Sequence, residues 1–292
     1  MNVAVIITTK DRPDFLARAI YSLLSQSCLP SEIVVVDDHS NTPISTNSID
    51  NFISKANKKG ISFSYYYNEQ PKGGNFSRNF GVKNSSSDII MFLDDDDSWE
   101  QHKIKDQVSI LERDRSIGLV YTGKVFVYDT DLESSFRRSH ETKATQSIWC
   151  GNFIGSTSGV AVLRATFLLA GQFDEKLQSL QDYDLWIRIL KETKVVWDGE
   201  HNLRYTIHSN RNGQVTSNVD KHLATVNYLK NKYKDELSLI PSKQKRVFNS
   251  RLDHVIARAY RRNNDIRFVK FFLKSLLGQP SLRTLALIFS YD

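Results

Sequence analysis

The 292-residue sequence contains little cysteine, with only Cys28 and Cys150. Two cysteines so far apart exclude a disulfide-rich scaffold and a zinc finger, and they favour a reducing compartment. Neither cysteine has a histidine at a motif spacing, so a thiol nucleophile is not expected. Any chemistry must therefore come from other side chains.

Long hydrophobic runs are also absent. No apolar stretch approaches the about 20 residues that a membrane-spanning helix needs. The short apolar run at 3–7 follows no basic segment and precedes no small-residue cleavage site, so it predicts a buried strand and not a signal peptide. We therefore expect a cytoplasmic protein, either free or bound peripherally to the inner face of a membrane.

Two glycine-rich nucleotide motifs are missing as well. The sequence has no G-x-x-x-x-G-K-[ST] loop, and no G-x-G-x-x-G follows the first predicted strand. Such loops hold phosphates in P-loop kinases and dinucleotides in dehydrogenases. Both enzyme classes are therefore disfavoured.

The composition that remains is typical of a folded protein, with 40% hydrophobic, 25% charged and 11% aromatic residues. A disordered or fibrous chain has a different balance. The net charge is +6 and the isoelectric point is about 9.1. This mild positive charge suits an anionic partner, either a nucleotide, a nucleic acid or an anionic membrane surface, and does not decide among them.

Strand-like and helix-like patterns alternate in the N-terminal third of the sequence. Short apolar runs predict buried strands, and apolar residues every three or four positions predict helices. The predicted strands are 3–8, 32–36, 63–67 and 89–93, and the predicted helices are 14–27, 49–57 and 73–82. This alternation indicates an α/β fold with a doubly wound sheet and right-handed crossovers.

The pattern changes after about residue 118, where strands and helices no longer alternate regularly. The expected elements are a helix from near Trp99, strands at 119–128, 158–163, 195–197 and 203–207, helices at 164–170 and 181–192, and a loop or exposed hairpin at 136–145. From about residue 218 the sequence is mainly helical in character and basic. We therefore expect an α/β domain over residues 1–217 and a helical C-terminal extension over residues 218–292.

Polar clusters follow three of the first four predicted strands, at 8–12, 37–38 and 94–97. In an open α/β sheet, ligands bind at the carboxyl ends of the strands. The run 94–97 consists of four aspartates, which repel one another unless a cation neutralises them. Mg²⁺ or Mn²⁺ binds one or two carboxylates together with phosphate oxygens. The alternative is a solvated acidic turn that caps the following helix.

Four segments, in order and at matching spacing, resemble the family 2 glycosyltransferases with the GT-A fold, of the type that assembles bacterial surface polysaccharides. The segments are VAVIITTKDRPDFLARAIYSLLSQS, EIVVVDDHS, GGNFSRNFGV with DIIMFLDDDDSW, and GQFDEKLQSLQDYDLWIRIL. The match spans about residues 1–210. It implies a doubly wound mixed sheet of the GT-A type, and an enzyme that transfers a sugar from a nucleotide-diphosphate sugar.

The resemblance assigns the nucleotide side of the site to residues of the first three segments. Thr8 and Asp38 lie where the family holds the base and ribose, and Arg78 lies where an arginine faces the nucleotide. A carboxylate accepts hydrogen bonds from such groups, and a guanidinium suits phosphate. The alternatives are a turn-forming role for Asp38 and a solvated position on a helix for Arg78.

The D-x-D motif of the family corresponds best to 94–96. The resemblance then implies that Asp96 binds Mn²⁺ or Mg²⁺, and that Asp94 and Asp95 lie on the nucleotide-sugar side. Because the next residue is also aspartate, the register of the metal ligand can shift by one. His208 matches a histidine that approaches the metal or the diphosphate. Its alternative is a structural role at a strand end.

The fourth segment contains the candidate catalytic residue. Asp182 matches the general base that removes the proton from the acceptor hydroxyl in an inverting transfer. Gln181 replaces the glutamate usual in the family, and Asp184 is expected to be structural. The alternative for Asp182 is a carboxylate that complements the helix dipole. The loop 155–158 and Trp149 are weaker candidates for the acceptor side, with ordinary packing as the alternative.

The C-terminal extension is rich in lysine and arginine. Its segment 266–277, IRFVKFFLKSLL, has apolar residues at helical spacing with basic residues between them. Such a helix lies in the interface of an anionic membrane, or packs on another part of the protein or on a second copy. The apolar stretch 285–291 also requires a partner surface.

The resemblance, together with the acidic run, implies an inverting, metal-dependent glycosyltransferase with a UDP-sugar donor and a saccharide or lipid-linked saccharide acceptor, acting in capsule or O-antigen synthesis. One alternative is a sugar-phosphate nucleotidyltransferase, but the residues after the first strand lack its glycine-rich loop. Another is a basic nucleic-acid-binding module. Acidic clusters at the strand ends repel phosphates, so no nucleic acid partner is expected.

Overall fold

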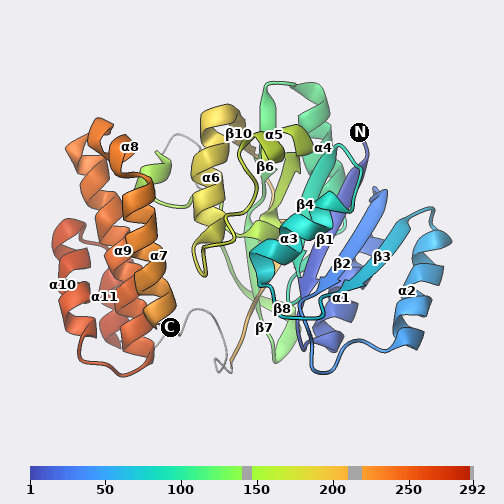
Figure 1. Ribbon diagram of the computed structural model, residues 1–292, viewed down its shortest axis with the longest axis horizontal. Helices are drawn as coiled ribbons and strands as arrows, with labels where there is room; N and C mark the ends of the chain where they lie inside the picture. Colours follow the sequence, from blue (N-terminus) through green and yellow to red (C-terminus); the bar gives the residue numbers. More distant parts are fainter. Residues whose placement is uncertain (140–146, 210–218, 290–292) are drawn as a thin grey trace. The chain divides into compact units, whose positions relative to one another are not determined.

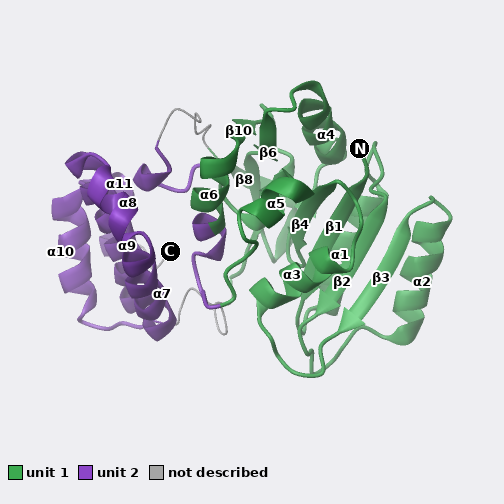
Figure 2. Cartoon of the chain, turned by 45° about the horizontal axis from the view of Figure 1, so that its top comes forward, with its two compact units in different colours: residues 1–144, 154–175, 185–209 green, residues 145–153, 176–184, 210–292 purple. Residues whose placement is uncertain are grey.

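The computed structural model describes residues 1–139, 147–209 and 219–289. The chain forms two compact units (Figures 1 and 2). Unit 1 comprises residues 1–144, 154–175 and 185–209, and unit 2 comprises residues 145–153, 176–184 and 210–292. The boundary expected between residues 217 and 218 lies outside the described residues and stays a prediction.

Unit 1 is built on a seven-stranded sheet with the order β10-β6-β9-β4-β1-β2-β3. The strands are β1 (Val3–Thr9), β2 (Glu32–Asp37), β3 (Ser62–Tyr67), β4 (Ile89–Asp94), β6 (Ile117–Tyr121), β9 (Val160–Leu163) and β10 (Lys194–Trp197). Every pairing is parallel except those of β9, which runs antiparallel to both β4 and β6. The expected α/β fold with a mixed sheet is confirmed.

Helices cover both faces of this sheet (Figure 1). They are α1 (Pro13–Leu24), α2 (Thr46–Asn57), α3 (Gly74–Lys83), α4 (Lys103–Arg113), α5 (Arg164–Leu169) and α6 (Gln181–Glu192), the last of which begins in unit 2. Alternate residues of β1 point to opposite faces. Val5 joins the core formed with α1, α2 and α4, whereas Ile6 faces α3. A Cβ atom at Gly81 would lie 2.4 Å from the Ile6 side chain, so glycine permits this close packing.

A second, four-stranded sheet has the order β5-β11-β7-β8. Its strands are β5 (Ser98–Trp99), β7 (Lys124–Tyr128), β8 (Asp131–Arg138) and β11 (Leu203–Ile207). Because β5 pairs with β11, the chain directly after the aspartate run lies beside residues 203–204. This pairing places β11, which lies near the C-terminal end of unit 1, next to the end of β4.

The structure corrects two expected elements and decides part of a third. The strand expected at 119–128 is two strands, because the chain leaves the large sheet at Thr122 and Gly123 and enters the small one. The helix expected from Trp99 begins at Lys103, since Trp99 itself belongs to β5. Of the loop or exposed hairpin expected at 136–145, the part up to Arg138 belongs to the exposed strand β8, which pairs antiparallel with β7 as in a hairpin, and residues 140–146 lie outside the described part.

Unit 2 is mainly helical, with α7 (Val219–Lys232), α8 (Lys234–Leu239), α9 (Ser242–Arg262), α10 (Phe268–Gly278) and α11 (Leu282–Phe289). Trp149 packs edge-on against Tyr233 and Phe248, with ring centroids 5.4 and 5.5 Å apart. These contacts agree with the ordinary packing role that was the alternative for Trp149. Ala257, Phe272 and Leu287 form a further core among α9, α10 and α11. Among the described residues, no helix combines the length and apolar character needed to cross a membrane.

Candidate functional site

The four aspartates form a tight turn at the carboxyl end of β4. Asp94 is the last residue of the strand, and its register partner on β1 is Thr8. The backbone N–H of Asp97 donates to the carbonyl of Asp94 over 3.0 Å, which closes the turn. The turn therefore places the carboxylates at the edge of the sheet where the polar end of β1 also lies.

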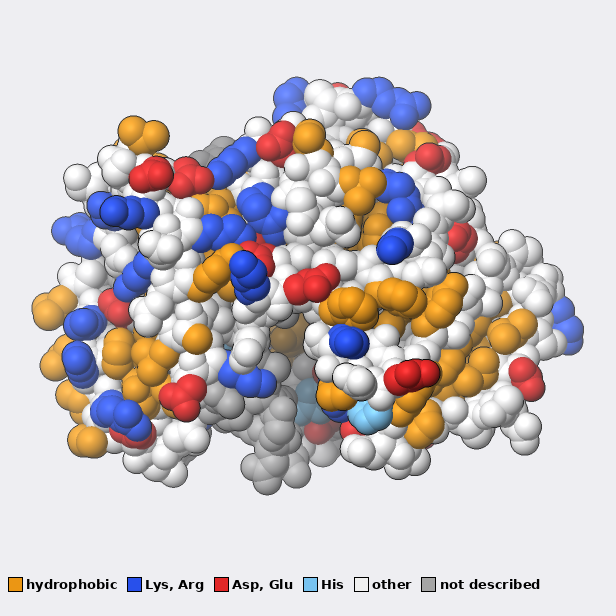
Figure 3. Space-filling view, viewed as in Figure 1, with side chains coloured by type: hydrophobic (Ala, Val, Ile, Leu, Met, Phe, Trp, Pro, Cys, Tyr) orange, Lys and Arg blue, Asp and Glu red, His pale blue; other side chains and the backbone are white. Residues whose placement is uncertain are grey.

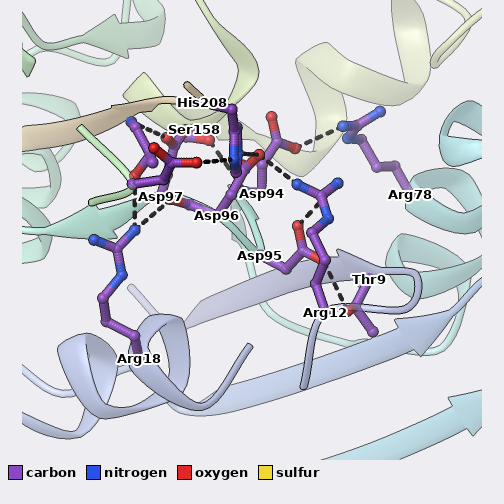
Figure 4. A network of polar contacts seen from close by, with 12 residues as sticks. Thr9, Arg12, Arg18, Arg78, Asp94, Asp95, Asp96, Asp97, Ser158 and His208 are labelled. Atoms are coloured by element: carbon purple, nitrogen blue, oxygen red, sulfur yellow. Dashed lines mark hydrogen bonds and ion pairs between the residues drawn. The ribbon is translucent and has the colours of Figure 1, made fainter. Parts of the chain in front are cut away.

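Asp94 forms an ion pair with Arg78 of α3. The guanidinium donates to the carboxylate over 2.6 Å, and the arginine side chain is largely buried (Figure 4). The backbone N–H of Asp94 also donates to the hydroxyl of Ser158, 3.1 Å away. Arg78 is thus a buried partner of the acidic turn, which disfavours the alternative of a solvated helix arginine.

Asp95 is buried beneath the turn. It accepts a hydrogen bond of 2.8 Å from the hydroxyl of Thr9, and the guanidinium of Arg12 lies 3.4 Å from its other oxygen. Burial raises the pKa of Asp95 to about 7, although the positive charge of Arg12 opposes that shift. The threonine that contacts the acidic turn is therefore Thr9, whereas the predicted residue Thr8 is the backbone register partner of Asp94.

Asp96 points toward two basic groups (Figure 4). One of its oxygens accepts hydrogen bonds from Arg12 over 2.5 Å and from His208 over 2.9 Å. Burial alone would raise the pKa of Asp96, but the hydrogen bond from His208 and the charge of Arg12 lower it overall. The other ring nitrogen of His208 lies 3.4 Å from Asp129. The hydrogen bond to Asp96 raises the pKa of His208, which favours the protonated imidazole.

Asp97 faces away from this basic pair. It accepts a hydrogen bond of 3.1 Å from the backbone N–H of Thr206 on β11, and its side chain is 1% exposed. Burial raises the pKa of Asp97 well above its ordinary value. By contrast, the Asp96 side chain is 21% exposed. Of the two registers that the sequence allowed, the accessible carboxylate is that of Asp96.

An aromatic support lies behind the turn. The indole N–H of Trp99 donates to the carbonyl of Ser158 over 2.9 Å, and Ser158 in turn binds the backbone of Asp94. The ammonium of buried Lys103 lies 3.9 Å from the centroid of the Trp99 ring and donates to Gln107 over 2.8 Å. Burial lowers the pKa of Lys103 to about 7. This support fixes the backbone at the end of β4.

Asp38 organises the start of α3. Its carboxylate accepts hydrogen bonds from the backbone N–H groups of Lys72 and Gly73 over 2.7 and 2.9 Å, and from the side chain of Asn68 over 3.0 Å. Gly73 has φ of 90°, a conformation that favours glycine. Asp38 thereby positions the helix that contains Arg78.

Asp182 is a residue of unit 2, at the second position of α6. It is half-buried, and it accepts hydrogen bonds from the side chain of Asn152 over 3.2 Å and from the backbone N–H of Tyr183 over 2.7 Å. Asp184 is fully buried and binds the hydroxyl of Tyr233 over 2.7 Å and the ammonium of Lys232 over 2.8 Å. The structural role expected for Asp184 agrees with this environment.

The fit of a divalent cation rests on Asp96 and His208. Among residues 1–139, 147–209 and 219–289, no three histidine, cysteine or acidic side chains gather as a complete metal site. Asp96 and His208 supply one carboxylate and one imidazole, 2.9 Å apart, and His208 can bind a metal only in its neutral form, in exchange for its hydrogen bond to Asp96. Mg²⁺ and Mn²⁺ bind a few protein ligands and take other oxygens from phosphate, so these two residues fit a metal that a diphosphate helps to hold.

The structure thus joins Arg78, Asp94, Asp95, Asp96 and His208 in one network of unit 1, next to Thr8 and the Asp38 turn. It adds Arg12, whose role the sequence did not predict, although Arg12 belongs to the polar cluster after the first strand. Arg18 of α1 is a second addition. It donates to the backbone carbonyl of Asp96 and to the hydroxyl of Thr206. No spacing rule connects α1 to residue 206.

Sequence comparison identifies a family and several relatives. The profile of "Glycosyl transferase family 2" matches residues 4–168, which is more than half of the chain. An uncharacterized glycosyltransferase of Haemophilus influenzae is 23% identical over 290 residues, which cover 96% of this chain and 92% of the relative. The amylovoran biosynthesis glycosyltransferase AmsB of Erwinia amylovora is 25% identical over 200 residues, which cover 64% of each protein.

Comparison with solved structures gives the same fold. TarS residues 1–349 of S. aureus, solved in complex with UDP, superpose with a TM-score of 0.58 at 15% identity. The match covers 99% of this chain and 92% of the TarS chain. At this identity the similarity concerns the arrangement of strands and helices, including the C-terminal helical part.

Proposed function

The chain belongs to glycosyl transferase family 2 and has the GT-A fold, and from this premise we propose the reaction that it catalyses. The enzyme transfers a sugar, most simply a hexose, from a UDP-sugar to a hydroxyl of a saccharide or lipid-linked saccharide, with inversion at the anomeric carbon. The observation that supports this proposal is the network of arginine, histidine and aspartate at the carboxyl end of β4. The family also favours this reaction over nucleotidyl transfer or nucleic-acid binding.

The donor side of the proposal is built from unit 1. Thr8 and Asp38 would contact the base and ribose, and Arg78 with Asp94 and Asp95 would contact the rest of the nucleotide sugar. The structure supports a common location, because Asp38 positions the helix that contains Arg78 and Arg78 binds Asp94. UDP is the preferred nucleotide because the TarS structure was solved with UDP.

A divalent cation is part of the proposal, with Asp96 and His208 as the residues that would hold Mn²⁺ or Mg²⁺. When bound, the cation would neutralise negative charge on the diphosphate leaving group. Arg12 lies against Asp96 and Asp95 and supplies a fixed positive charge beside the same position. The residues of the chain therefore orient the diphosphate and balance its charge.

Proton transfer is assigned to Asp182. A carboxylate at a helix start, half-buried and hydrogen-bonded by Asn152, is held in one orientation while it keeps access to solvent. It would accept the proton of the acceptor hydroxyl as that oxygen attacks the sugar. The biological setting that we propose is polysaccharide synthesis, because AmsB is an amylovoran biosynthesis enzyme.

Calorimetric titration of UDP, GDP and TDP, each with and without Mn²⁺, tests the donor site. We expect metal-dependent binding of UDP to the wild type and its loss in Asp96→Asn, which keeps the shape of the side chain and removes its charge. Asp50→Asn on α2 is the matched control, because Asp50 is exposed and away from the acidic turn. Binding of no nucleotide under any condition would refute the proposal.

The catalytic role of Asp182 is tested separately. Asp182→Asn should bind UDP as the wild type does, yet transfer sugar from the UDP-sugar about 10²–10⁴-fold more slowly, the range expected for loss of a general base. Nuclear magnetic resonance of the first product formed reports its anomeric configuration. Retention of configuration, or an unchanged rate in Asp182→Asn, contradicts the inverting mechanism.

A further inference from the structure

Helix α10 of unit 2 exposes an apolar stripe. Val269, Leu273 and Leu277 follow one another at intervals of four residues, and all three are exposed. Residues at this spacing share one face of a helix. Ile266, just before the helix, is 82% exposed, and Leu277 is 81% exposed. The buried face of α10 is a different one, since Phe272 packs into the core of unit 2.

Basic side chains border this stripe. Lys270 and Lys274 are exposed, and each directly follows an apolar residue of the stripe, so they lie along its edge. Over residues 266–289 the charged residues are all basic, and no aspartate or glutamate occurs. Figure 3 shows hydrophobic side chains interleaved with lysine and arginine side chains over α10.

Helix α11 continues the pattern. Its exposed large apolar residues are Leu282, Leu285, Ile288 and Phe289, of which the first three follow one another at intervals of three. Phe289 is 87% exposed. The opposite side of α11 is used for packing, because Leu287 is buried against the core. We call the exposed residues of α10 and α11 the basic–apolar surface.

We propose that the basic–apolar surface binds an anionic lipid bilayer. Leucine, isoleucine and phenylalanine side chains enter the acyl boundary of a bilayer, while neighbouring lysines meet the lipid phosphates. A second copy of the chain fits less well, because a symmetric contact would place the lysines of one copy against those of the other. The combination of lysines and apolar side chains therefore favours a partner with a negatively charged surface and an apolar interior, as an anionic bilayer has.

This binding lies outside the proposed catalytic machinery. All residues of the basic–apolar surface belong to unit 2, whereas the proposed nucleotide-binding residues belong to unit 1. Nucleotide binding and lipid binding therefore have separate tests. If the acceptor is lipid-linked, the surface would hold the enzyme at the membrane that contains the acceptor, and this last consequence rests on the proposed function.

Flotation of the full chain with vesicles tests the proposal. We expect binding to vesicles of phosphatidylcholine with 30% phosphatidylserine in about 0.1 M salt, and much weaker binding to pure phosphatidylcholine. Binding should fall as salt rises, because exposed charges are screened. The double variant Lys270→Glu/Lys274→Glu should bind at least about 25-fold more weakly, since each lysine near an anionic surface contributes about 1 kcal/mol.

Matched control variants distinguish binding through this surface from nonspecific binding to vesicles. Leu273→Asp should abolish flotation, whereas Leu239→Asp on α8, the same substitution at a still more exposed leucine of unit 2, should not. Lys58→Glu/Lys59→Glu in unit 1 makes the same charge change and should leave flotation intact. All four variants should keep the wild-type melting temperature and UDP binding.

Three results would overturn the proposal. The first is absence of wild-type flotation with anionic vesicles. The second is equal loss of binding in the control variants. The third is a concentration-dependent dimer, detected by sedimentation velocity, that Leu273→Asp dissociates, because the occupant of the surface would then be a second copy.

Discussion

The fully buried carboxylate of Asp184 permits a graded test of how unit 2 is stabilised. Among its neighbours, Tyr233 donates a hydrogen bond of 2.7 Å to this carboxylate and Lys232 forms an ion pair with it at 2.8 Å. Tyr233→Phe removes one hydrogen bond to a charged group, which costs about 1.5–3 kcal/mol. Lys232→Met removes the ammonium group that pairs with the buried Asp184 carboxylate. Loss of one partner of a buried ion pair costs about 3–5 kcal/mol of the free energy of unfolding in a dry interior. Because the Lys232 side chain is 23% exposed, we expect the lower end of that range.

Urea unfolding at pH 7, followed by tryptophan fluorescence, measures both losses. Lys232→Met should lower the free energy of unfolding by more than Tyr233→Phe does. The double variant should cost less than the sum of the two, because both side chains act on the same carboxylate. Lys234→Met on α8 is the control. Lys234 is exposed, so the change should stay within about 0.5 kcal/mol.

The reasoning is refuted if Lys232→Met is no more destabilising than Lys234→Met. In that case water or another group would neutralise Asp184, and the ion pair would contribute nothing measurable. A further consequence concerns catalysis. Asp184 lies two residues after Asp182 on α6, so Tyr233→Phe should slow sugar transfer with little change in the affinity for UDP.

Two further predictions concern pH. Burial, with nearby arginines, lowers the pKa of His254 to about 3, below the value of about 6.5 in the unfolded chain. The contribution of neutral His254 to the free energy of unfolding is therefore fully present above pH 6.5 and decreases as the pH falls toward 3. Urea unfolding of wild type should lose about 2 kcal/mol between pH 7 and pH 5 relative to His254→Asn. Lys103, with its pKa lowered to about 7, should make wild-type stability rise between pH 7 and pH 10 relative to Lys103→Met, and parallel curves would contradict this.

Much of the fold of unit 1 follows from local patterns. The continuous apolar run of β4 predicts a strand that is buried on both faces, and all of its residues up to Leu93 are buried. The run after residue 118 misled the prediction because both of its halves are strand-like. The division at Thr122 and Gly123 depends on pairing with β10 and β11, which lie about 70 or more residues later in the chain.

The candidate site shows the same division between local and distant information. The aspartate run, Arg78 and His208 stand out in the sequence because the resemblance supplies their positions. The ion pair between Arg12 and Asp96 could not be predicted in this way, because nothing in the residues after β1 indicates that they contact the turn after β4. A turn-forming role was an alternative for Asp38, but no pattern shows that the turn is the one before α3, because the bonded N–H groups belong to residues 72 and 73 of the backbone.

The antiparallel strand β9 has a consequence for how the protein is synthesised. Between β4 and β6 the large sheet is completed only by residues 160–163, and Ser158, just before them, binds the backbone of Asp94. During translation, β4 therefore has an unpaired edge until the chain has been extended past residue 163. His208 joins Asp96 later still. We expect nascent chains that stall before β9 to expose this apolar edge and to require chaperones, which makes this interval the point of greatest aggregation risk.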